Sequence, residues 1–559
     1  MAIETKNQVA TFPADWDEPF EDGEPFYFDP MHFPHPVSPL TASTMGPAFE
    51  VGITTAAREQ EAPLKDYQVR YRNHYRFDRQ VIAQPASDSE ARSLGEAAEA
   101  SAKTEVGRLL ERWHGEHLPR VSANLDRLRA MDVPGATDAE LVTMLDEVDA
   151  IHRDLWTVHF RIALPMLVGI QLYDEFYAEL FGEAEADSHA LLVGGVSESV
   201  KAGFGLSDLA ASARELGLAQ LIQETPSHAL LPALEATKEG RAFLAKLQAY
   251  LDEYGLRQDL FEYATPTWLE DPSIALSSIR NYVLTERDAR AEHAAMARSA
   301  ESALAAAREQ LVMYPEAVRS QFEALVQFGR QGTFLQEEHN FYIDQRGLAL
   351  LRLFYLRVGD RLVDQGRLAG PDDIFMLTSD ELRNVVAGAG NAEAANQVRA
   401  LIQTRREEMD LARTLTPPPF IGAAPTEPPP TGNPMERANA RFFGGPPQQA
   451  DTPGQLNGSA GSRGVATGIA RVARTLEEAT RVLPGEILVA VTTMPAWTPL
   501  FGIVAAVVTE TGGPLSHCAI VAREYGIPAV VGAYGATGAI ATGQRITVDG
   551  GSGIVTFDA

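Results

Sequence analysis

Residues 507–533 read VVTETGGPLSHCAIVAREYGIPAVVGA, and the local structure of the C-terminal region follows from them. A run of apolar, β-branched residues leads into the glycine turn at 511–513, as at the end of a buried strand. Ser516 and His517 then open a stretch with helical spacing, which Gly526 ends. The pattern therefore predicts a strand, a glycine turn and a helix, in that order.

A histidine at the start of this helix has properties that suit phosphoryl transfer. Gly512 and Gly513 permit a backbone that brings N–H groups close to a ligand, and the N-terminus of a helix favours an anion. The same helix dipole disfavours a cationic imidazole, so His517 is expected to be neutral and nucleophilic. From the spacing alone, a histidine that merely caps the helix is an equally good interpretation.

Short apolar runs separated by Gly and Pro flank this unit on both sides. We expect strands at 486–491, 503–509, 529–531 and 545–548, with one helix at 516–525. These elements predict a small, separate α/β domain over residues 462–559.

The same region resembles the swivelling phosphohistidine domain of the phosphoenolpyruvate-utilising enzymes, which include rifampicin phosphotransferase and phenylphosphate synthase. GVATGIARV at 464–472 is similar to the opening of that domain, and GQRITVDGGSGIVTF at 543–557 is similar to its closing hairpin. The resemblance implies that His517 carries the phosphoryl group. It also implies a phosphate-binding turn made of Thr511, Gly512, Gly513 and Ser516. Cys518 stands where several of these enzymes have Ala or Gly, and we assign it no catalytic role.

The composition excludes several classes of protein. A chain of 559 residues predicts two or three domains. The net charge of −29 disfavours binding to nucleic acid or to anionic membranes. The single cysteine excludes a disulfide framework and a thiolate zinc site within the chain, and the motifs predict no metal site. Without a leader-like start or a long apolar run, a cytoplasmic protein is expected.

Three further parts are expected before the C-terminal domain. Residues 1–87 are rich in aromatic residues and proline, which predicts an irregular segment that packs on the next part. Helical spacing of apolar residues, for example over 106–113, predicts a large, mainly helical acceptor-binding domain at 88–414. Residues 415–461 are rich in Pro and Gly and are expected to form a partly stiff linker. The expected fold class is a multidomain combination of α and α/β parts.

The helical part resembles the acceptor-side portion of rifampicin phosphotransferase and phenylphosphate synthase. The segments concerned are FYFDPMHFPHPVSPL at 26–40, FLQEEHNFYIDQ at 334–345 and VGDRLVDQGRLAGPDDIFMLTSDEL at 358–382. The sequence shows no Walker-type loop and no pattern of an ATP-grasp domain or a phosphoenolpyruvate-binding barrel. Phenylphosphate synthase and the related 4-methylphenyl phosphate synthase keep the ATP-binding subunit on a separate chain. The resemblance therefore implies a separate ATP-grasp partner subunit, which binds ATP and Mg²⁺.

The implied reaction has two stages. The partner phosphorylates His517, and the domain then swings on its linker and delivers the phosphoryl group to the hydroxyl of a phenol or cresol, giving an aryl phosphate. Two alternatives stay open: the same carrier acting on another alcohol, such as an antibiotic hydroxyl, and a non-catalytic regulatory relative. Retention of His517 within its glycine turn speaks against the regulatory relative.

A phenolic acceptor needs a base near its hydroxyl and cations or N–H donors near the phosphate. Glu338 and His339 are the expected catalytic pair on the acceptor side. Glu337, Tyr342 and Arg346, on the same helical segment, are expected to bind the substrate. A solvated, charged helix is the alternative interpretation of this cluster.

Two other groups of residues contain histidine. Asp29 and His32 form a second expected substrate-binding pair, because a proline-rich loop could lay them over a pocket; a capping Asp with a surface His is the alternative. His152 and His159, seven residues apart and beside Trp156, are expected to be core histidines.

Overall fold

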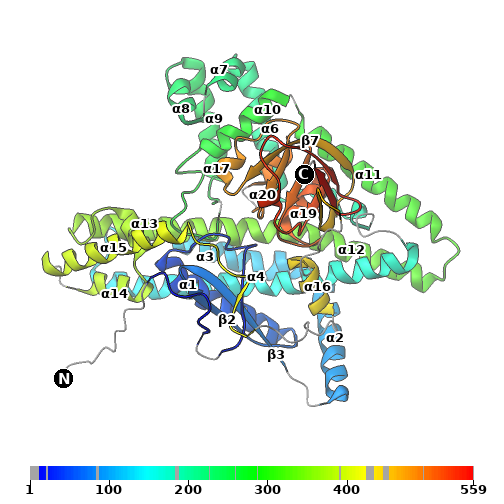
Figure 1. Cartoon of the computed structure of the whole chain (residues 1–559), viewed down its shortest axis with the longest axis horizontal. Helices are drawn as coiled ribbons and strands as arrows, with labels where there is room; N and C mark the ends of the chain where they lie inside the picture. The colour runs from blue at the N-terminus through cyan, green and yellow to red at the C-terminus, as the bar shows by residue number, and fades with distance from the viewer. Residues whose placement is uncertain are drawn as a thin grey trace.

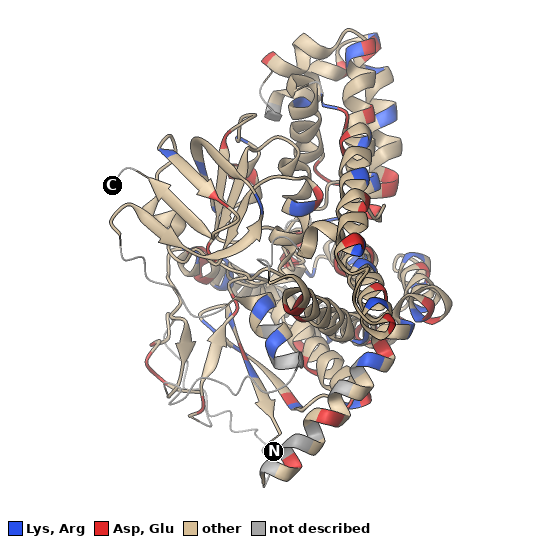
Figure 2. Cartoon of the chain, turned by 90° about the vertical axis from the view of Figure 1, so that its right-hand side faces the viewer, with Lys and Arg blue, Asp and Glu red and all other residues tan. Residues whose placement is uncertain are grey.

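The structure is a computed structural model of the 559-residue chain. It describes residues 12–20, 23–83, 87–182, 188–225, 227–258, 260–285, 287–388, 392–423, 434–444, 452–494 and 497–557. A helical body carries a C-terminal α/β domain, which lies above the long helices α4 and α12 in Figure 1, with the N-terminal segment below them. Acidic and basic residues are interspersed along the helices, and the α/β domain carries few of either (Figure 2).

The helix α4, Asp138–Phe181, is the central element of the body. Thr137 and Glu140 form a capping box at its start, and Gly182 ends it in the left-handed conformation at φ 61°. The helix is apolar and long enough to cross a membrane by length and composition, but 78% of its most apolar window is buried inside the protein. The contacts with α1 (Pro39–Glu59) and α12 (Glu316–His339) show that α4 is an internal core helix.

The described part of the N-terminal segment contains regular structure, mainly between residues 39 and 82, which differs from the irregular structure expected for residues 1–87. It contains α1 and the strands β1 (Phe26–Phe28), β2 (Leu64–Arg72) and β3 (Tyr75–Ile82). Pro39, which looks like a helix breaker in the sequence, stands in the first turn of α1 behind the capping residue Ser38. Proline is tolerated there because the N–H that it lacks has no partner within the helix.

The other helical elements of the body fill the range where helices are expected. They are α2 (Asp88–Arg112), the π-helical η1 (Trp113–His117), α3 (Leu118–Ala130), η2 (His189–Leu191), α6 (Glu198–Glu215), α7 (Ala219–Glu224), α8 (Ser227–Glu235), α9 (Lys238–Tyr254), α10 (Ser273–Thr285), α11 (Ala289–Gln310), the π-helical η3 (Asn340–Gly347), α13 (Leu348–Asp364), η4 (Pro371–Met376), α14 (Ser379–Ala387) and α15 (Ala392–Ala412).

The C-terminal domain is built on an eight-stranded sheet with the order β5-β12-β11-β7-β8-β9-β10-β6. Its elements are β5 (Gln455–Asn457), β6 (Ser459–Ser462), β7 (Val465–Ala473), α17 (Leu476–Ala479), β8 (Ile487–Ala490), α18 (Thr498–Phe501), β9 (Ala506–Thr509), α19 (His517–Glu524), β10 (Ala529–Val531), α20 (Ala536–Ala539), β11 (Arg545–Asp549) and β12 (Ile554–Phe557). The strands β7, β8, β9 and β10 are parallel neighbours. The predicted strands and helix are confirmed to within three residues at each end.

The expected linker at 415–461 contains regular structure where the chain is described. The strand β4 (Phe420–Ile421) completes the N-terminal sheet, in the order β2-β3-β1-β4, and β5 and β6 belong to the C-terminal sheet. The helix α16, Pro434–Phe443, packs on α4. Residues 424–433 and 445–451 lie outside the described part of the chain. Parts of the expected linker thus belong to the N-terminal sheet and to the C-terminal sheet.

The helix α16 also holds the glycine turn of the C-terminal domain. Arg437 forms an ion pair with Glu175 at 2.6 Å, and Arg441 forms one with Asp174 at 2.8 Å. The amide of Gly513 donates a hydrogen bond of 2.8 Å to the carbonyl oxygen of Phe442. The domain is therefore docked on the body through the backbone of its own linker.

Gly513→Ala is expected to weaken this docking. A Cβ atom at Gly513 would lie 1.9 Å from the carbonyl oxygen of Arg441, so the turn and α16 would have to separate. We expect a larger radius of gyration by small-angle X-ray scattering and faster cleavage near α16 in limited proteolysis. Gly538→Ala, where the added atom meets nothing within 4 Å, is the matched control. Unchanged scattering and cleavage for Gly513→Ala would contradict the docking role.

Candidate functional site

His517 stands at the first position of α19, directly after the glycine turn. Gly512 has a φ of +87°, and a Cβ atom there would meet the side chain of Ser516 at 2.8 Å. Both its backbone conformation and the space around it therefore require glycine. The amide of Ser516 donates to the carbonyl oxygen of Gly513 at 2.9 Å, which closes the turn and presents His517 at the domain surface.

The imidazole of His517 faces the helical body. Its Nδ1 lies 3.1 Å from Oε1 of Glu337 on α12, and its Nε2 lies 3.5 Å from the hydroxyl of Thr498. Glu337 is fully buried. Burial alone would raise the pKa of Glu337, but the charge of His517 and the hydrogen bond to it outweigh burial and lower this pKa. When His517 is neutral, its Nδ1–H donates a hydrogen bond to Glu337, and the lone pair of the ring is on Nε2.

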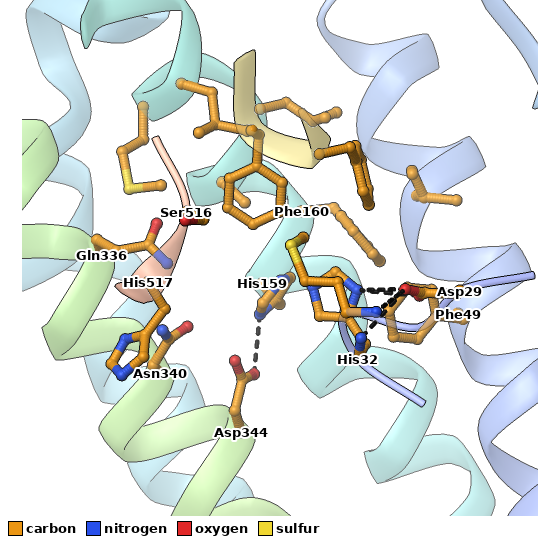
Figure 3. Close-up of a pocket in the computed structure, with 18 of the residues that line it drawn as sticks. Asp29, His32, Phe49, His159, Phe160, Gln336, Asn340, Asp344, Ser516 and His517 are labelled. Atoms are coloured by element: carbon orange, nitrogen blue, oxygen red, sulfur yellow. Dashed lines mark hydrogen bonds and ion pairs between the residues drawn. The ribbon is translucent and has the colours of Figure 1, made fainter. Parts of the chain in front are cut away.

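His517 lines a cavity between the C-terminal domain and the body, with about 150 Å³ of free space. Thr511, Gly512 and Ser516 of the turn also line it, and Ser516 Oγ has no partner among the described residues. The remaining walls are mostly apolar and come from α1, α4, α12, η3, α16 and the N-terminal sheet. Figure 3 shows how the helical side chains surround this space. Its aromatic side chains are Phe49, Tyr67, Trp156, Phe160, Phe261, Phe442 and Phe443. Such a cavity suits an apolar, ring-shaped molecule that carries a few polar groups.

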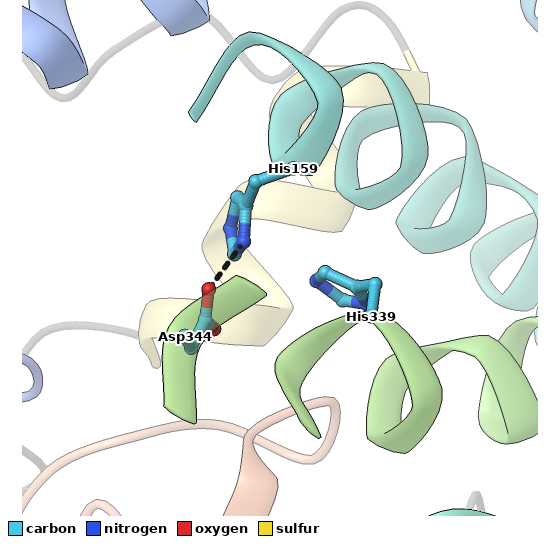
Figure 4. A group of neighbouring side chains, drawn as sticks. All are labelled: His159, His339 and Asp344. Atoms are coloured by element: carbon cyan, nitrogen blue, oxygen red, sulfur yellow. Dashed lines mark hydrogen bonds and ion pairs between the residues drawn. The ribbon is translucent and has the colours of Figure 1, made fainter. Parts of the chain in front are cut away.

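A cluster of His159, His339 and Asp344 lies in the wall of this cavity (Figures 3 and 4). His159 Nδ1 and Asp344 Oδ1 are 2.9 Å apart. His339 Nδ1 lies 2.6 Å from the carbonyl oxygen of Leu335, to which it donates. Its Nε2 is buried and has no partner among the described residues. Burial lowers the pKa of His339 to about 4, so this imidazole is neutral at physiological pH.

The expected pair Asp29 and His32 lies in another part of the cavity wall. His32 Nδ1 and Asp29 Oδ2 are 2.9 Å apart, and the imidazole stacks on Phe261 and Phe442. Burial opposes the charged form of His32, but the charge of Asp29 and the hydrogen bond to it raise the pKa of His32 overall. The structure thus brings this pair to the cavity that contains His517.

The charged segment on α12 and η3 is divided among different surroundings. Glu337 contacts His517, and His339 lines the cavity. Glu338, Tyr342 and Arg346 are not part of the cavity wall. Burial and then the charge of Glu198 raise the pKa of Glu338 to about 7. Arg346 stacks on Phe341, with 4.5 Å from its guanidinium carbon to the ring centroid, and donates to the carbonyl oxygen of Glu253.

The pair of His159 and Asp344 was not foreseen from the sequence. Of the two histidines expected in the core, His152 is there, since it accepts a hydrogen bond of 2.9 Å from the indole of Trp156. His159 instead lines the cavity. Its partner, Asp344, is 185 residues away along the chain, so no local pattern in the sequence reveals this contact. Asp344 itself belongs to the charged segment that the sequence marks at 337–346.

Two families match this chain. Residues 482–553 match the family described as PEP-utilising enzyme, mobile domain, and residues 159–337 match the rifampicin phosphotransferase fourth domain. The first match contains His517, and the second runs from His159 to Glu337. Both matched regions therefore contribute residues to the cavity wall, His517 from the first and His159 from the second.

Several named proteins are similar to this chain. Chondramide synthase cmdD of Chondromyces crocatus is 34% identical over 98% of this chain and 14% of its own length. The uncharacterized phosphotransferase YvkC of Bacillus subtilis (strain 168) is 28% identical over 93% of this chain and 60% of its own length. A rifampicin phosphotransferase of Streptomyces sviceus is 29% identical over 78% of this chain and 49% of its own length. The chain thus spans less than two thirds of each of these relatives.

The pH dependence of stability tests the raised pKa of Glu338, a residue of α12 outside the cavity wall. Because its folded-state pKa is about 7, the folded protein keeps a proton that the unfolded chain releases at lower pH. Glu338 therefore contributes most to stability below the unfolded pKa, and this contribution is lost as the pH rises to about 7. Glu338→Gln is expected to melt at the same temperature as the wild type near pH 4 and several degrees higher above pH 7. A melting difference that does not change with pH would contradict this assignment.

Proposed function

Because the chain joins the mobile domain of the phosphoenolpyruvate-utilising enzymes to a helical region of the rifampicin phosphotransferase type, we propose that it is a phosphotransferase that carries a phosphoryl group on His517. The group passes to a hydroxyl of a small molecule in the cavity between the two parts. One observation carries this proposal: His517 of the docked mobile domain lines the same cavity as the aromatic and polar side chains of the body.

The contact with Glu337 favours one nitrogen of His517 for the chemistry. With its proton held on Nδ1 by Glu337, the imidazole offers Nε2 as the atom that bears the phosphoryl group. In the transfer, the bond between Nε2 and phosphorus breaks and its electron pair returns to Nε2. A bond forms between the hydroxyl oxygen and phosphorus, and the hydroxyl proton passes to a base of the cluster of His159, His339 and Asp344. The cluster of His159, His339 and Asp344 supplies the polar groups that activate this hydroxyl.

The size and walls of the cavity support a phenol or cresol as the acceptor. Its free space is about 150 Å³, and an engineered apolar cavity of about 150 Å³ in another protein binds benzene. The seven aromatic side chains can pack against a ring. The relatives named rifampicin phosphotransferase favour a second candidate, the hydroxyl of a larger antibiotic, which would need a wider opening of the docked domain.

The phosphoryl group of the proposed reaction comes from ATP bound with Mg²⁺. We assign the nucleotide to an ATP-grasp subunit or domain outside these 559 residues. Charging by that partner requires the mobile domain to leave α12, because His517 is largely covered in the docked arrangement, with 11% of its side chain exposed. A location in the cytoplasm, where ATP is present, is part of this proposal.

Replacement of His517 tests the carrier role. The full chain is incubated with its ATP-grasp partner, ATP, Mg²⁺ and phenol, or phosphorylated chemically with phosphoramidate when the partner is not at hand. We expect acid-labile phosphate on the peptide that contains His517 and, with phenol, an aryl phosphate; His517→Ala should give neither product. His114→Ala, at an exposed histidine of the body, is the control for unrelated imidazoles. Aryl phosphate formation by His517→Ala would disprove the carrier role.

The acceptor class is tested by discharging phosphorylated His517 with a panel of alcohols. We expect phenol and cresols to remove the phosphate faster than aliphatic alcohols of similar size, because their rings pack on the aromatic walls. Mass spectrometry of the His517 peptide follows the loss. Discharge by a rifamycin antibiotic but not by phenols would favour the second candidate.

A further inference from the structure

We propose that His159, His339 and Asp344 bind one divalent transition-metal ion in the wall of the acceptor cavity. Metal binding is independent of the phosphoryl transfer proposed above, whereas the use of the ion at the acceptor hydroxyl rests on that transfer. The observation that carries the inference is His339 Nε2, a buried ring nitrogen with no partner among the described residues, next to a second imidazole and a carboxylate.

The three side chains converge on one space. One ligand atom from each lies within 4.8 Å of the others, and the two imidazole rings are 4.7 Å apart between centroids. His159 comes from α4, while His339 and Asp344 come from the junction of α12 and η3 (Figure 4). At tetrahedral angles, Zn–N bonds of about 2.0–2.1 Å place ligand atoms roughly 3.3–3.4 Å apart, so the three side chains would have to draw together from separations of up to 4.8 Å.

The π-helical segment explains how two residues five positions apart share one face. In an α-helix with 3.6 residues per turn, positions 339 and 344 would point roughly 140° apart. The wider turn of η3, Asn340–Gly347, reduces this angle, so Asp344 returns to the side of His339. Single turns of π-helix occur frequently at functional sites, because they re-aim side chains at a cost to regular hydrogen bonding.

The tautomer of His339 is the one that a metal ligand requires. Its Nδ1 proton is donated to the carbonyl oxygen of Leu335, which fixes the tautomer and leaves the lone pair on Nε2. Two imidazoles with one carboxylate suit zinc, cobalt or ferrous ions better than Mg²⁺, which prefers oxygen ligands.

A hydrogen-bonded pair alone does not account for this arrangement. The cavity contains a second pair, His32 with Asp29, at the same 2.9 Å and without a further histidine beside it. In the cluster, His159 and Asp344 already satisfy each other, yet His339 buries a polar nitrogen next to them. Leaving such a nitrogen buried and unpaired is unfavourable, and a bound ion would offset that cost.

A bound ion would give the proposed transfer its activated nucleophile. Three protein ligands leave at least one position open, as in catalytic zinc sites. The acceptor hydroxyl would bind there through oxygen and release its proton to water, because a divalent cation lowers the pKa of a bound hydroxyl group. The oxygen anion then attacks phosphorus on His517 Nε2, and the electron pair of the broken bond returns to the imidazole.

The experiment uses the full chain, stripped with EDTA and titrated with CoCl₂. We expect a visible absorption band of bound Co²⁺, a stoichiometry of one by calorimetry, and loss of the band on addition of ZnCl₂. His339→Ala and Asp344→Asn should each weaken Co²⁺ binding by more than about 10-fold. His32→Ala is the matched control and should bind Co²⁺ like the wild type. Circular dichroism verifies that each variant is folded, and His159→Gln replaces any variant that is not.

Absence of stoichiometric Co²⁺ binding to the folded wild type, or unchanged binding in the ligand variants, would overturn the metal site. A second measurement distinguishes failure of the metal site from failure of the proposed function. It follows the loss of phosphate from chemically phosphorylated His517 after phenol is added. Discharge that proceeds equally in EDTA would exclude the ion from the reaction and leave the phosphotransferase proposal standing. Bound Co²⁺ without any discharge would retain the metal site and remove the acceptor assignment.

Discussion

The buried contact between Glu337 and His517 is the constraint on which the rest of the site depends. Glu337 is fully buried on α12, where a carboxylate without a partner costs several kcal/mol. His517 supplies the partner only when the mobile domain is docked, at 3.1 Å from Nδ1 to Oε1. Undocking must therefore hydrate Glu337 or transfer its charge to another group. The same contact that fixes the imidazole thus favours the docked domain.

Docking also builds the cavity. Its walls include the glycine turn of the mobile domain, Phe442 and Phe443 of α16, and the aromatic residues of the body. A molecule that fills this space contacts all three parts, so its binding and the docking of the domain stabilise each other. The glycine turn remains bonded to α16 through the amide of Gly513 and the carbonyl oxygen of Phe442.

Local chemistry explains what the sequence could and could not predict. The strands and the helix around His517 were foreseen because glycine turns and short β-branched runs encode them locally. The regular structure of the N-terminal segment was missed because Pro39 serves as a helix start, which the sequence does not distinguish from a break. The roles expected of the charged segment at 337–346 stay predictions, and its residues face different surroundings, since η3 changes the angle between successive side chains. The partnership of His159 with Asp344 depends on how α4 packs on α12, which no local pattern encodes.

The helix α12 continues directly into η3, and together they carry residues of two parts of the site. These parts are the contact with His517 and the cluster of His159, His339 and Asp344. Glu337 contacts His517, and His339, two residues later, belongs to the cluster with His159 and Asp344. Successive positions of an α-helix point about 100° apart, so these residues face separate directions from a single rigid element. The π-helical turn that follows adds Asp344 to the side of His339 without moving Glu337. Because Glu337 and His339 belong to one helix that packs on α4, their spacing is set within the helical body and does not depend on the C-terminal domain.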